Sequence, residues 1–496
     1  MSSHGSTYMP NFVPPRSRYH DSGKFGRLFG ELPPFASDNP SVRAALLELG
    51  KPGGLMDAQD NLDATPQQLI VDPALSANNP NNPRMTAGMT FLGQFVDHDM
   101  TFDPTSSLER QADPEQITNF RTPTLSLDNL YGSGPDATPH LYSRSQPAKF
   151  LVESGGSHDD LPRNSEGVAL IGDPRNDENL VVSQLHLAFL KFHNAIVDRL
   201  APLGLQGAEL FAEAQRLVRW HYQWILLHQF LPLTCGQDCV DDVLNHGRKF
   251  YQWKNDPFIP VEFSVAAYRF GHSQVRPSYR VNFTSNGGDP LFAMIFGKPG
   301  ANPQDPDDMR GGCRAPRRYI GWPTFFDFGD GNSRPNKKID TKLSSALFRL
   351  PPSVVANPSL PGNPGSLAQR NLLRHLTFSL PSGQRVAKAM NLEVLPESAL
   401  TELKPLELDR ATPLWYYVLK EAEVMSSGEH LGPVGGRIVA EVLIGLMQGD
   451  KQSYLSQDPD WTPTLPTLKP GTDGQFFDML DLLTIADPNA GKAAMN

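Results

Sequence analysis

The chain has 496 residues, of which 39% are hydrophobic and 20% are charged, so it is long enough to bury a large core. Its formal net charge of -10 argues against nucleic acid or an anionic membrane as the main partner and favours small molecules. Cys235, Cys239 and Cys313 are too few and too unevenly placed for a disulfide framework or a tetrahedral zinc site. We expect Cys235 and Cys239 to be buried apolar fillers.

The N-terminal region lacks the continuous apolar core that a Sec-type signal peptide needs. The most apolar stretch, residues 224–231, is short and interrupted by polar side chains, so it is too short to span a bilayer. These features predict a protein with no transmembrane segment that is either cytoplasmic or secreted without a Sec-type signal peptide.

Apolar residues at helical spacing recur along most of the chain, whereas strand-like alternation is scarce. The predicted helices are, in chain order, Asn179–Leu200, Glu209–Leu231, Arg385–Met390, Leu414–Ser426 and Gly435–Met447. The Gly- and Pro-rich stretches Gly297–Pro316 and Pro351–Pro364 are expected to be surface loops. We predict one large, mainly α domain with very little β over residues 26–485, with a flexible N-terminal tail at 1–25 and a C-terminal tail at 486–496.

The segment Gly93–Asp99 concentrates side chains that can carry acid–base or metal chemistry. On a helix, Gln94, Asp97 and His98 share one face, and Asp99 points about 100° further round. A histidine beside a glutamine suits a proton-transferring base over a cofactor, and an outward carboxylate suits a hard cation such as calcium. The alternative is a solvated helix end with scattered charges.

A second cluster precedes the predicted helix 179–200. Arg175 and Glu178 stand three residues apart across the helix start, where an arginine can stabilise negative charge that develops on a bound oxygen. The alternative is helix capping and a local salt bridge. His186 and His193 lie on one side of the following helix, too far apart to share a metal, and are interpreted as structural histidines.

A third element contains His272 within the apolar segment Ala267–Ser273, and Asn371–Arg374 follows later in the chain. Such a histidine is by itself most often a core residue. The order of the three clusters changes this interpretation, because a haem enzyme needs an iron ligand on one face and acid–base groups on the other.

The chain resembles the animal-type haem peroxidases of the peroxidase–cyclooxygenase superfamily, which includes myeloperoxidase and lactoperoxidase. Six segments carry this resemblance in order, namely Gly93–Asp99, Tyr131–Ser133, Asp173–Glu178, Lys191–Asn194, Arg269–His272 and Asn371–Arg374. Three later segments, residues 339–342, 380–384 and 432–437, are similar to the bacterial branch. The resemblance spans most of the chain and implies a single-domain haem peroxidase-like fold.

The resemblance implies haem b as cofactor, with the distal base His98, its neighbour Gln94 and Arg175 on one side of it. On the other side it implies His272 as the proximal iron ligand, Asn371 as the partner of its second ring nitrogen, and Arg269 as a further haem contact. Asp97 and Glu178 match the carboxylates that form ester bonds to haem. Asn179 stands where myeloperoxidase has a methionine, so a sulfonium link is not expected.

The family also binds calcium between the outward carboxylate and a loop before the Tyr-Gly-Ser element. The matching oxygen-bearing residues here are Asp99, Thr122, Thr124, Ser126 and Asp128. Ser126 stands where many relatives have Asp, and Asp128 stands where mammalian members have Ser, so the number of carboxylates is kept. The alternative is an ordinary turn with hydroxyl and Asx capping.

The predicted function is a haem peroxidase that reduces hydrogen peroxide and oxidises a small donor, a halide, pseudohalide or phenolic. The first alternative is a fatty-acid dioxygenase or cyclooxygenase-like oxygenase. Oxygenases carry a radical tyrosine three residues before the proximal histidine, where this chain has Arg269 and the nearest tyrosine is Tyr268. Two functions of different classes also stay open, a non-haem metal hydrolase on residues 97–99 and a non-catalytic adhesion module.

Overall fold

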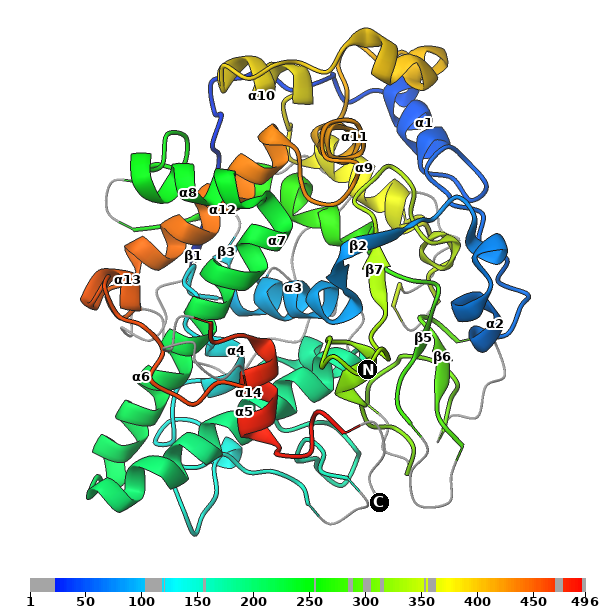
Figure 1. Ribbon diagram of the computed structural model, residues 1–496. Helices are drawn as coiled ribbons and strands as arrows, with labels where there is room; N and C mark the ends of the chain where they lie inside the picture. The colour runs from blue at the N-terminus through cyan, green and yellow to red at the C-terminus, as the bar shows by residue number, and fades with distance from the viewer. Residues whose placement is uncertain are drawn as a thin grey trace.

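A computed structural model describes residues 23–102, 118–119, 121–154, 158–253, 256–283, 289–297, 305–312, 316–351, 354–355, 363–468 and 476–492 (Figure 1). The protein is 47% helical and 8% strand, which confirms the predicted mainly α class. The α-helices are α1 (Pro40–Leu49), α2 (Pro66–Val71), α3 (Ala87–Met100), α4 (Asp128–Tyr131), α5 (Leu180–Leu200), α6 (Gly207–Ile225), α7 (Leu231–Cys235), α8 (Gln237–His246), α9 (Leu367–Thr377), α10 (Gly383–Ala389), α11 (Leu414–Met425), α12 (Pro433–Gly449), α13 (Tyr454–Gln457) and α14 (Met479–Ala486).

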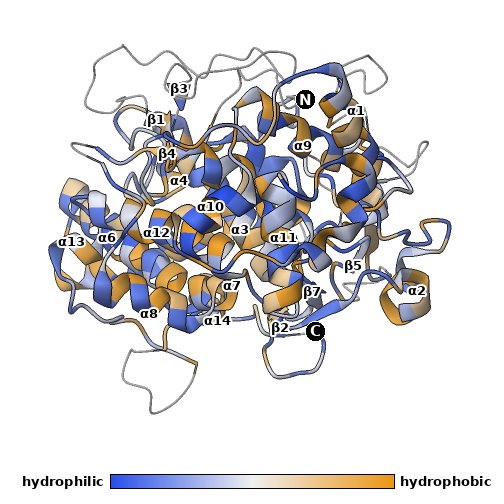
Figure 2. Cartoon of the chain, turned by 90° about the horizontal axis from the view of Figure 1, so that it is seen from above, coloured by the Kyte–Doolittle hydropathy of each residue, from blue (hydrophilic) through white to orange (hydrophobic). Residues whose placement is uncertain are grey.

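Helix α3 lies in the middle of the molecule, with α5, α6 and α14 on one side of it and α7, α11 and α12 on the other (Figure 1). Helix α5 contacts α3, α6 and α14, and α12 contacts α7, α8 and α11. Hydrophobic and hydrophilic residues alternate along most helices (Figure 2), as expected for helices that turn one face to a core. The buried centre is therefore built around α3, the helix that carries His98.

The five predicted helices all form, each with ends that differ from the prediction by a few residues. The second is longer than predicted, because α6 continues through a π-helical turn at Leu226–Phe230 into α7. Pro232 is tolerated there because it falls in the first turn of α7. The two predicted loops lie partly outside the described residues.

The strands are short and form three small sheets. Strand β1 (Gly23–Gly26) pairs antiparallel with β3 (Thr118–Asn119) and parallel with β4 (Ile259–Pro260). Strand β2 (Asn81–Thr86) pairs antiparallel with β7 (Pro335–Lys337), and β5 (Ser278–Arg280) pairs antiparallel with β6 (Phe292–Met294). Within the described residues, the first strand starts at Gly23, three residues before the predicted domain start, and the domain boundaries stay a prediction.

One helical segment corrects the sequence interpretation of membrane spans. Leu180–Leu203 is long and apolar enough to cross a membrane by length and composition, and residues 224–231 are therefore not the strongest candidate. The apolar window of this segment is 83% buried inside the protein, as the core helix of a globular protein is. The absence of a transmembrane segment stays a prediction.

The two described cysteines are free thiols, as predicted. Cys235 is buried and Cys239 is half-buried, and burial raises the pKa of both thiols. This fits the predicted role of apolar fillers. Cys313 lies outside the described residues.

Candidate active site

The position of α3 is set at its first turn. The backbone N–H groups of Ala87 and Gly88 donate to the carbonyls of Arg334 (2.8 Å) and Phe325 (2.9 Å). A β-carbon at Gly88 would lie 2.5 Å from the Phe326 ring, so only glycine permits this close approach. The predicted helix over the Gly93–Asp99 segment is thus confirmed, and it is anchored at its first turn, well before its end at Met100.

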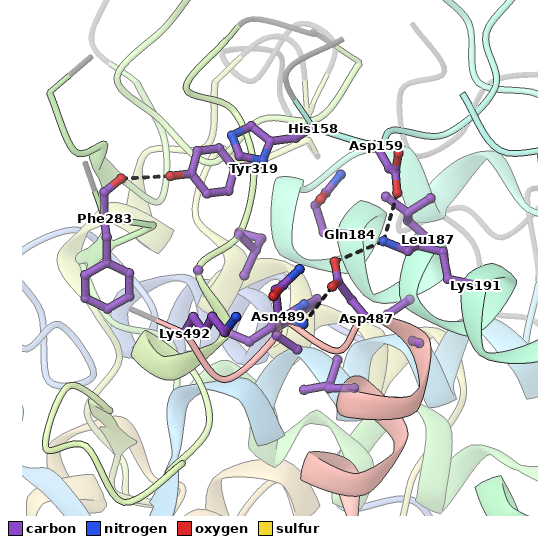
Figure 3. Close-up of a pocket in the computed structure, with 17 residues that line it drawn as sticks. His158, Asp159, Gln184, Leu187, Lys191, Phe283, Tyr319, Asp487, Asn489 and Lys492 are labelled. Atoms are coloured by element: carbon purple, nitrogen blue, oxygen red, sulfur yellow. Dashed lines mark hydrogen bonds and ion pairs between the residues drawn. The ribbon is translucent and has the colours of Figure 1, made fainter. Parts of the chain in front are cut away.

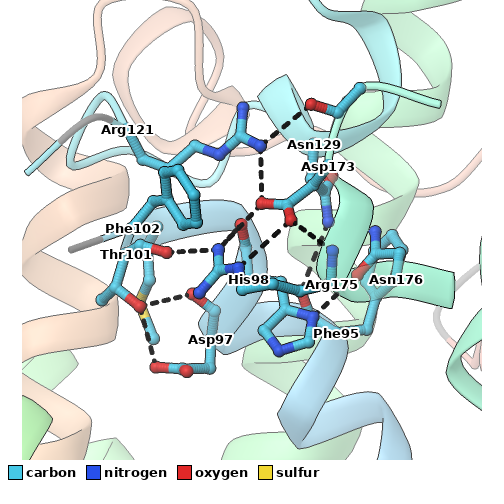
Figure 4. Close-up of polar contacts among 12 residues, drawn as sticks. Phe95, Asp97, His98, Thr101, Phe102, Arg121, Asn129, Asp173, Arg175 and Asn176 are labelled. Carbon is cyan, nitrogen blue, oxygen red and sulfur yellow. Dashed lines mark hydrogen bonds and ion pairs between the residues drawn. The ribbon is translucent and has the colours of Figure 1, made fainter. Parts of the chain in front are cut away.

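The predicted distal residues His98 and Arg175 lie side by side (Figure 4). Nη2 of Arg175 donates to the backbone carbonyls of His98 (3.1 Å) and Thr101 (2.5 Å), which ties the loop before α5 to the end of α3. Within the described part of the chain, no hydrogen bond is made by Nη1 of Arg175. This side of the guanidinium can therefore donate to a bound oxygen.

Asp173 holds Arg175 in this position. Its carboxylate accepts from Nε (3.1 Å) and Nη2 (2.8 Å) of Arg175 and from Nη2 of Arg121 (2.5 Å), and its side chain is fully buried. Burial alone would raise the pKa of Asp173, but the charges of Arg175 and Arg121 outweigh it and hold the pKa well below its ordinary value. Phe102 completes the cluster, since the guanidinium carbon of Arg175 lies 4.7 Å from its ring centre.

A second close approach fixes the segment that carries Asp173. A β-carbon at Gly172 would lie 2.5 Å from the backbone oxygen of Asn129, so the chain passes directly against the start of α4. Asp173 then caps the 3₁₀ helix Pro174–Asp177, and Asn179 caps α5 by accepting from Val181. Of the alternative interpretation of Arg175 and Glu178, the capping role falls to Asp173 and Asn179, but the local salt bridge is present, between Arg175 and Asp173 (2.8 Å).

Asp97 and Glu178, the two carboxylates that match the haem-ester positions, both have raised pKa values. Burial is the main cause for each, and the pKa of Glu178 rises to about 7. Asp97 accepts a hydrogen bond from the Thr101 hydroxyl (3.1 Å) and is influenced by the charges of both Arg175 and Arg269. Asp97 therefore lies within electrostatic reach of one arginine of each cluster.

The predicted proximal residues are also brought together. His272 ends a 3₁₀ helix, Ala267–His272, which follows directly on a π-helical turn, Glu262–Ala266. The backbone here is therefore not an α-helix. Nδ1 of His272 lies 2.7 Å from Nδ2 of Asn371 on α9, and Arg269 Nη1 donates to Oδ1 of the same asparagine (3.2 Å). A ring that binds a metal through Nε2 carries its proton on Nδ1, so iron binding requires the Asn371 amide to turn its oxygen toward His272.

A group of arginines surrounds this proximal histidine. Burial and the charges of Arg374 and Arg370 lower the pKa of Arg269 to about 10. Of these three guanidinium groups, Arg269 donates to the Ser264 carbonyl (3.0 Å) and Arg370 to the Pro364 carbonyl (3.3 Å). The charges of Arg374 and Arg370 thus act against the cationic form of Arg269, and the charge of Asp97 acts in its favour.

The predicted calcium residues form one cluster around the start of α4. The Thr124 hydroxyl donates to Ser126 Oγ (2.9 Å), which donates to Asp128 Oδ1 (2.8 Å), and Leu127 N–H donates to Asp99 Oδ2 (3.1 Å). Thr122 is joined to this loop by its backbone carbonyl, which accepts from the N–H of Thr124 (2.8 Å). Burial and the nearby Asp128 raise the pKa of Asp99 to about 7.

Asp99 points away from His98, as the helical spacing predicted. Its Oδ1 is buried, and the described residues give it no hydrogen-bond partner. The buried Tyr222 hydroxyl makes no hydrogen bond of standard geometry with the described residues, but it lies near Asp99, because burial, the charge of Asp99 and a side-chain interaction with Asp99 all raise its pKa. A hard cation such as calcium binds oxygen ligands, so it could bind a buried carboxylate oxygen that has no hydrogen-bond partner.

Two further residues named in the sequence analysis, Gln94 and Tyr268, lie on or against α3. Gln94 is half-buried on the same face of α3 as Asp97 and His98. The Tyr268 hydroxyl donates to the backbone carbonyl of Gly93 (3.1 Å), and its ring stacks on Phe263 (4.7 Å between ring centres). Tyr268 is therefore held against the backbone of α3.

A surface cavity of about 280 Å³ lies elsewhere, between α5, α14 and the segment 319–322 (Figure 3). The rings of His158 and Tyr319 stack in its wall (3.6 Å between centres), and Lys191 bridges Asp159 and Asp487. None of the predicted site residues lines it. The chemistry predicted from the sequence is therefore located in the buried centre and not at this cavity.

Several residues of the site were not predicted from the sequence. Asp173 lies inside a motif that was noted, and its place two residues before Arg175 could have indicated an N-cap. Arg121 and Asn176 carry no local signal, because their partners are far away in the chain. His186 was interpreted as structural, yet it contacts Asn176, which contacts His98.

Comparison with known proteins places these clusters in a family context. Residues 107–294 match the family model described as animal haem peroxidase. The chain is 24% identical over 319 residues to Peroxidasin of Drosophila melanogaster, which covers 59% of this chain and 19% of that protein. It is 24% identical over 383 residues to Peroxidasin homolog pxn-2 of Caenorhabditis elegans, which covers 68% and 27%. The chain thus spans about a fifth to a quarter of the length of these relatives.

Solved structures show the same fold. Peroxidase A from Dictyostelium discoideum aligns with a TM-score of 0.61 at 16% identity, covering 89% of this chain and 92% of that chain. A fatty acid alpha-dioxygenase from Arabidopsis thaliana aligns with a TM-score of 0.57 at 14% identity, covering 94% and 78%. The fold is therefore one that a peroxidase and an alpha-dioxygenase share. Within it, the sequence match relates this chain to the animal haem peroxidase family.

Proposed function

We propose that the chain is a haem peroxidase that reduces hydrogen peroxide and oxidises a small halide, pseudohalide or phenolic donor. The observation that carries the proposal is that Arg175 is bonded to the His98 backbone, that His272 and Arg269 both contact Asn371, and that the charges of Arg175 and Arg269 both act on Asp97. A haem enzyme needs these two sets of groups on opposite faces of its cofactor.

The residues present fit a haem. Asp97, Arg175 and Arg269 have pKa values shifted first of all by burial, yet each keeps an intermediate solvent exposure. These three side chains therefore lie deep in the protein but are still partly accessible. The cationic cluster of Arg269, Arg370 and Arg374 would be neutralised by the propionate groups of a haem.

The parts of the site have distinct roles in this proposal. His272 would hold the iron, and Asn371 would orient its ring. The haem supplies a redox-active iron when it is bound. His98 accepts the proton from hydrogen peroxide and returns it to the leaving oxygen as the O–O bond breaks, and Nη1 of Arg175 donates to the oxygen that gains negative charge. Gln94 adds a polar group on the same face.

The proposal extends to two further features. Asp97 and Glu178 would form ester bonds to methyl groups of the haem. Each bond would replace one methyl C–H and the carboxyl O–H, with one hydrogen peroxide as the two-electron oxidant that takes up both hydrogens as water. Both raised pKa values favour the neutral carboxyl, and an ester leaves no buried charge unpaired. Asp99 with the loop 122–128 would hold calcium, supported by the unsatisfied buried oxygen of Asp99. The likeness to myeloperoxidase and lactoperoxidase and to bacterial members rests on sequence segments alone.

Haem reconstitution tests the function directly. The protein supplemented with haem should show a Soret band and a pyridine haemochrome, and should consume hydrogen peroxide with bromide, iodide, thiocyanate or a phenol as donor. Absence of a Soret band would contradict the proposal. Haem that extracts freely into acidified acetone would contradict the ester bonds alone.

Calcium binding has an independent test. Titration with calcium should raise the thermal midpoint, and Asp99→Asn should remove this effect because it removes the buried carboxylate. Asp136→Asn, an exposed residue outside the loop, serves as the control. An unchanged midpoint in wild type upon calcium addition or chelation would contradict the site.

A fatty-acid oxygenase is the second candidate, because an alpha-dioxygenase shares the fold. Two features disfavour it. Arg269 occupies the position three residues before His272, and the Tyr268 hydroxyl is bonded to the backbone of α3. Oxygen uptake with a saturated fatty acid in the absence of peroxide would favour the oxygenase.

A metal hydrolase on residues 97–99 lacks converging ligands. Asp97 bonds Thr101, His98 bonds Asn176 and Asp99 bonds Leu127, so the three side chains face different partners. The described residues also hold no group of three or more His, Cys, Asp or Glu side chains that could bind one metal ion.

A further inference from the structure

Three elements meet at one buried amide, that of Asn176. Its Oδ1 lies 2.8 Å from Nδ1 of His98 on α3, and its Nδ2 lies 2.9 Å from Nδ1 of His186 on α5. Relative exposures are 4% for His98 and 0% for both Asn176 and His186. The amide therefore links the distal histidine to a second imidazole that no proposed catalytic step uses.

This link has a direction. An amide oxygen can only accept a hydrogen bond and an amide nitrogen can only donate one. With Oδ1 of Asn176 toward His98 and Nδ2 toward His186, Nδ1 of His98 carries a proton and Nδ1 of His186 is bare. Burial lowers the pKa of His186 to about 3, so its ring is neutral, and with the amide in this direction its single proton lies on Nε2, which has no hydrogen-bond partner among the described residues. The two rings thus hold opposite tautomers.

The tautomer of His98 decides what the ring can do. A proton on Nδ1 leaves Nε2 with a lone pair, which is the state that accepts a proton from peroxide. If the amide were turned by 180°, Nδ2 would face His98, Nδ1 would be bare, and Nε2 would carry the proton. The ring would then be a donor at Nε2 and could not act as a base there.

We propose that Asn176 is a positioning residue that holds His98 in its base-competent tautomer, and that His186 fixes the direction of the Asn176 amide by accepting from its nitrogen. The role in peroxide reduction rests on the proposed function. The opposite tautomers follow from the hydrogen bonds alone and are tested separately.

The tautomers can be read by nitrogen NMR of histidine-labelled, haem-loaded protein in its diamagnetic ferrous carbonmonoxy form. Protonated and bare ring nitrogens have well-separated shifts, and His98→Ala and His186→Phe assign the two rings. We expect a protonated Nδ1 for His98 and a bare Nδ1 for His186. In Asn176→Asp, both carboxylate oxygens accept, so His186 should invert its tautomer while His98 keeps its own. The same tautomer on both rings in wild type would overturn the proposal.

Stopped-flow mixing with hydrogen peroxide tests the consequence. Asn176→Leu removes the acceptor for His98 Nδ1, and the bimolecular rate should fall roughly 10- to 100-fold, as for other partners that orient a functional imidazole. Asn176→Asp should restore most of the rate, which a merely structural role would not predict. His186→Phe should give a smaller loss, because the amide keeps its oxygen but loses the group that sets its direction.

His193→Phe is the matched control, since His193 is a buried histidine on the same helix that bonds Tyr131 and the Ala148 carbonyl instead. Its peroxide rate should stay at the wild-type value. An equal loss in His193→Phe, or a wild-type rate in Asn176→Leu, would overturn the positioning role. If Asn176→Leu does not fold, His186→Phe decides in its place. A haem-loaded wild type that does not react with peroxide would refute the proposed function, while the NMR result would still decide the tautomers.

Discussion

The distal and proximal clusters differ in how completely their charges are satisfied. On the distal side, Asp173 neutralises Arg175 and Arg121 through hydrogen bonds of 2.5–3.1 Å. On the proximal side, Arg374 and Arg370 repel Arg269 and lower its pKa. The distal groups are thus arranged by the protein itself. On the proximal side, two neighbouring charges instead act against the cationic form of Arg269.

The strongest test of this contrast removes one histidine from each side. His98→Ala should keep haem but slow the reaction with peroxide roughly 10²- to 10⁴-fold, because the proton-transferring group is lost while the iron ligand stays. His272→Ala should instead weaken haem binding or change its spin state. Haem titration and stopped-flow absorbance measure both. The contrast breaks if the two variants behave alike.

The distal network should also be the more costly to break in protein stability. Asp173→Asn removes the fully buried carboxylate that pairs with Arg175 and Arg121, whose side chains are only 12% and 13% exposed, so the free energy of unfolding should fall by roughly 3 kcal/mol. Urea denaturation measures the change. Asp307→Asn removes an exposed partner of Arg317 and should change stability by roughly 1 kcal/mol or less. Equal effects of the two variants would show that the distal network is not preorganised.

Both sides share buried, neutral histidines, and this gives a pH dependence. Burial lowers the pKa of His186 to about 3, and that of His193 and His375 to about 4. Because the unfolded histidine has a pKa near 6.5, their contribution to stability is full above about pH 6.5 and is lost as the pH falls toward about 4.

The histidines by themselves should therefore lower the free energy of unfolding by several kcal/mol over this range, since each pKa unit corresponds to about 1.4 kcal/mol. The raised pKa values of Asp99 and Glu178 act in the opposite direction, so the test is the difference in slope between wild type and a variant that lacks one histidine. Urea midpoints measured between pH 7 and pH 4 provide the test. His186→Phe should flatten the slope, because it removes one of the protonating groups. A slope unchanged by this substitution would mean that His186 is not buried neutral.

The smallest expected effect is on the proximal side, at Arg374. Arg374→Met removes one of the charges that lower the pKa of Arg269, and the stability of the haem-free variant measures what Arg374 contributes to the fold by itself. Haem affinity should fall by roughly 10- to 100-fold, because a charge-assisted hydrogen bond contributes about 1.5–3 kcal/mol. Calorimetry of haem-free protein and haem titration give the two values. A loss of stability without a loss of affinity would show that Arg374 is structural.

Local spacing was enough to predict part of this site. The periodicity of an α-helix placed Asp97 and His98 toward the cluster that contains Arg175, and turned Asp99 toward the loop around Asp128. The helix over residues 180–200 was predicted for the same reason, since its apolar face repeats at helical spacing. Around His272 the backbone is instead a π-helical turn followed by a 3₁₀ helix, which no apolar pattern indicated.

By itself, the sequence determined the mainly α class, the helical spacing of residues 94–99 and the residue types that can move a proton or bind an iron or a hard cation. Only the tertiary structure decided which of them meet. Asn176 lies 78 residues from His98, and Arg269 lies 102 residues from Asn371, so no local pattern relates them. Hydrogen bonds and buried charges act over a few ångströms in space, whatever the separation along the chain. The direction of the Asn176 amide, and with it the tautomer of His98, exists only once α3, α5 and the loop between them have come together.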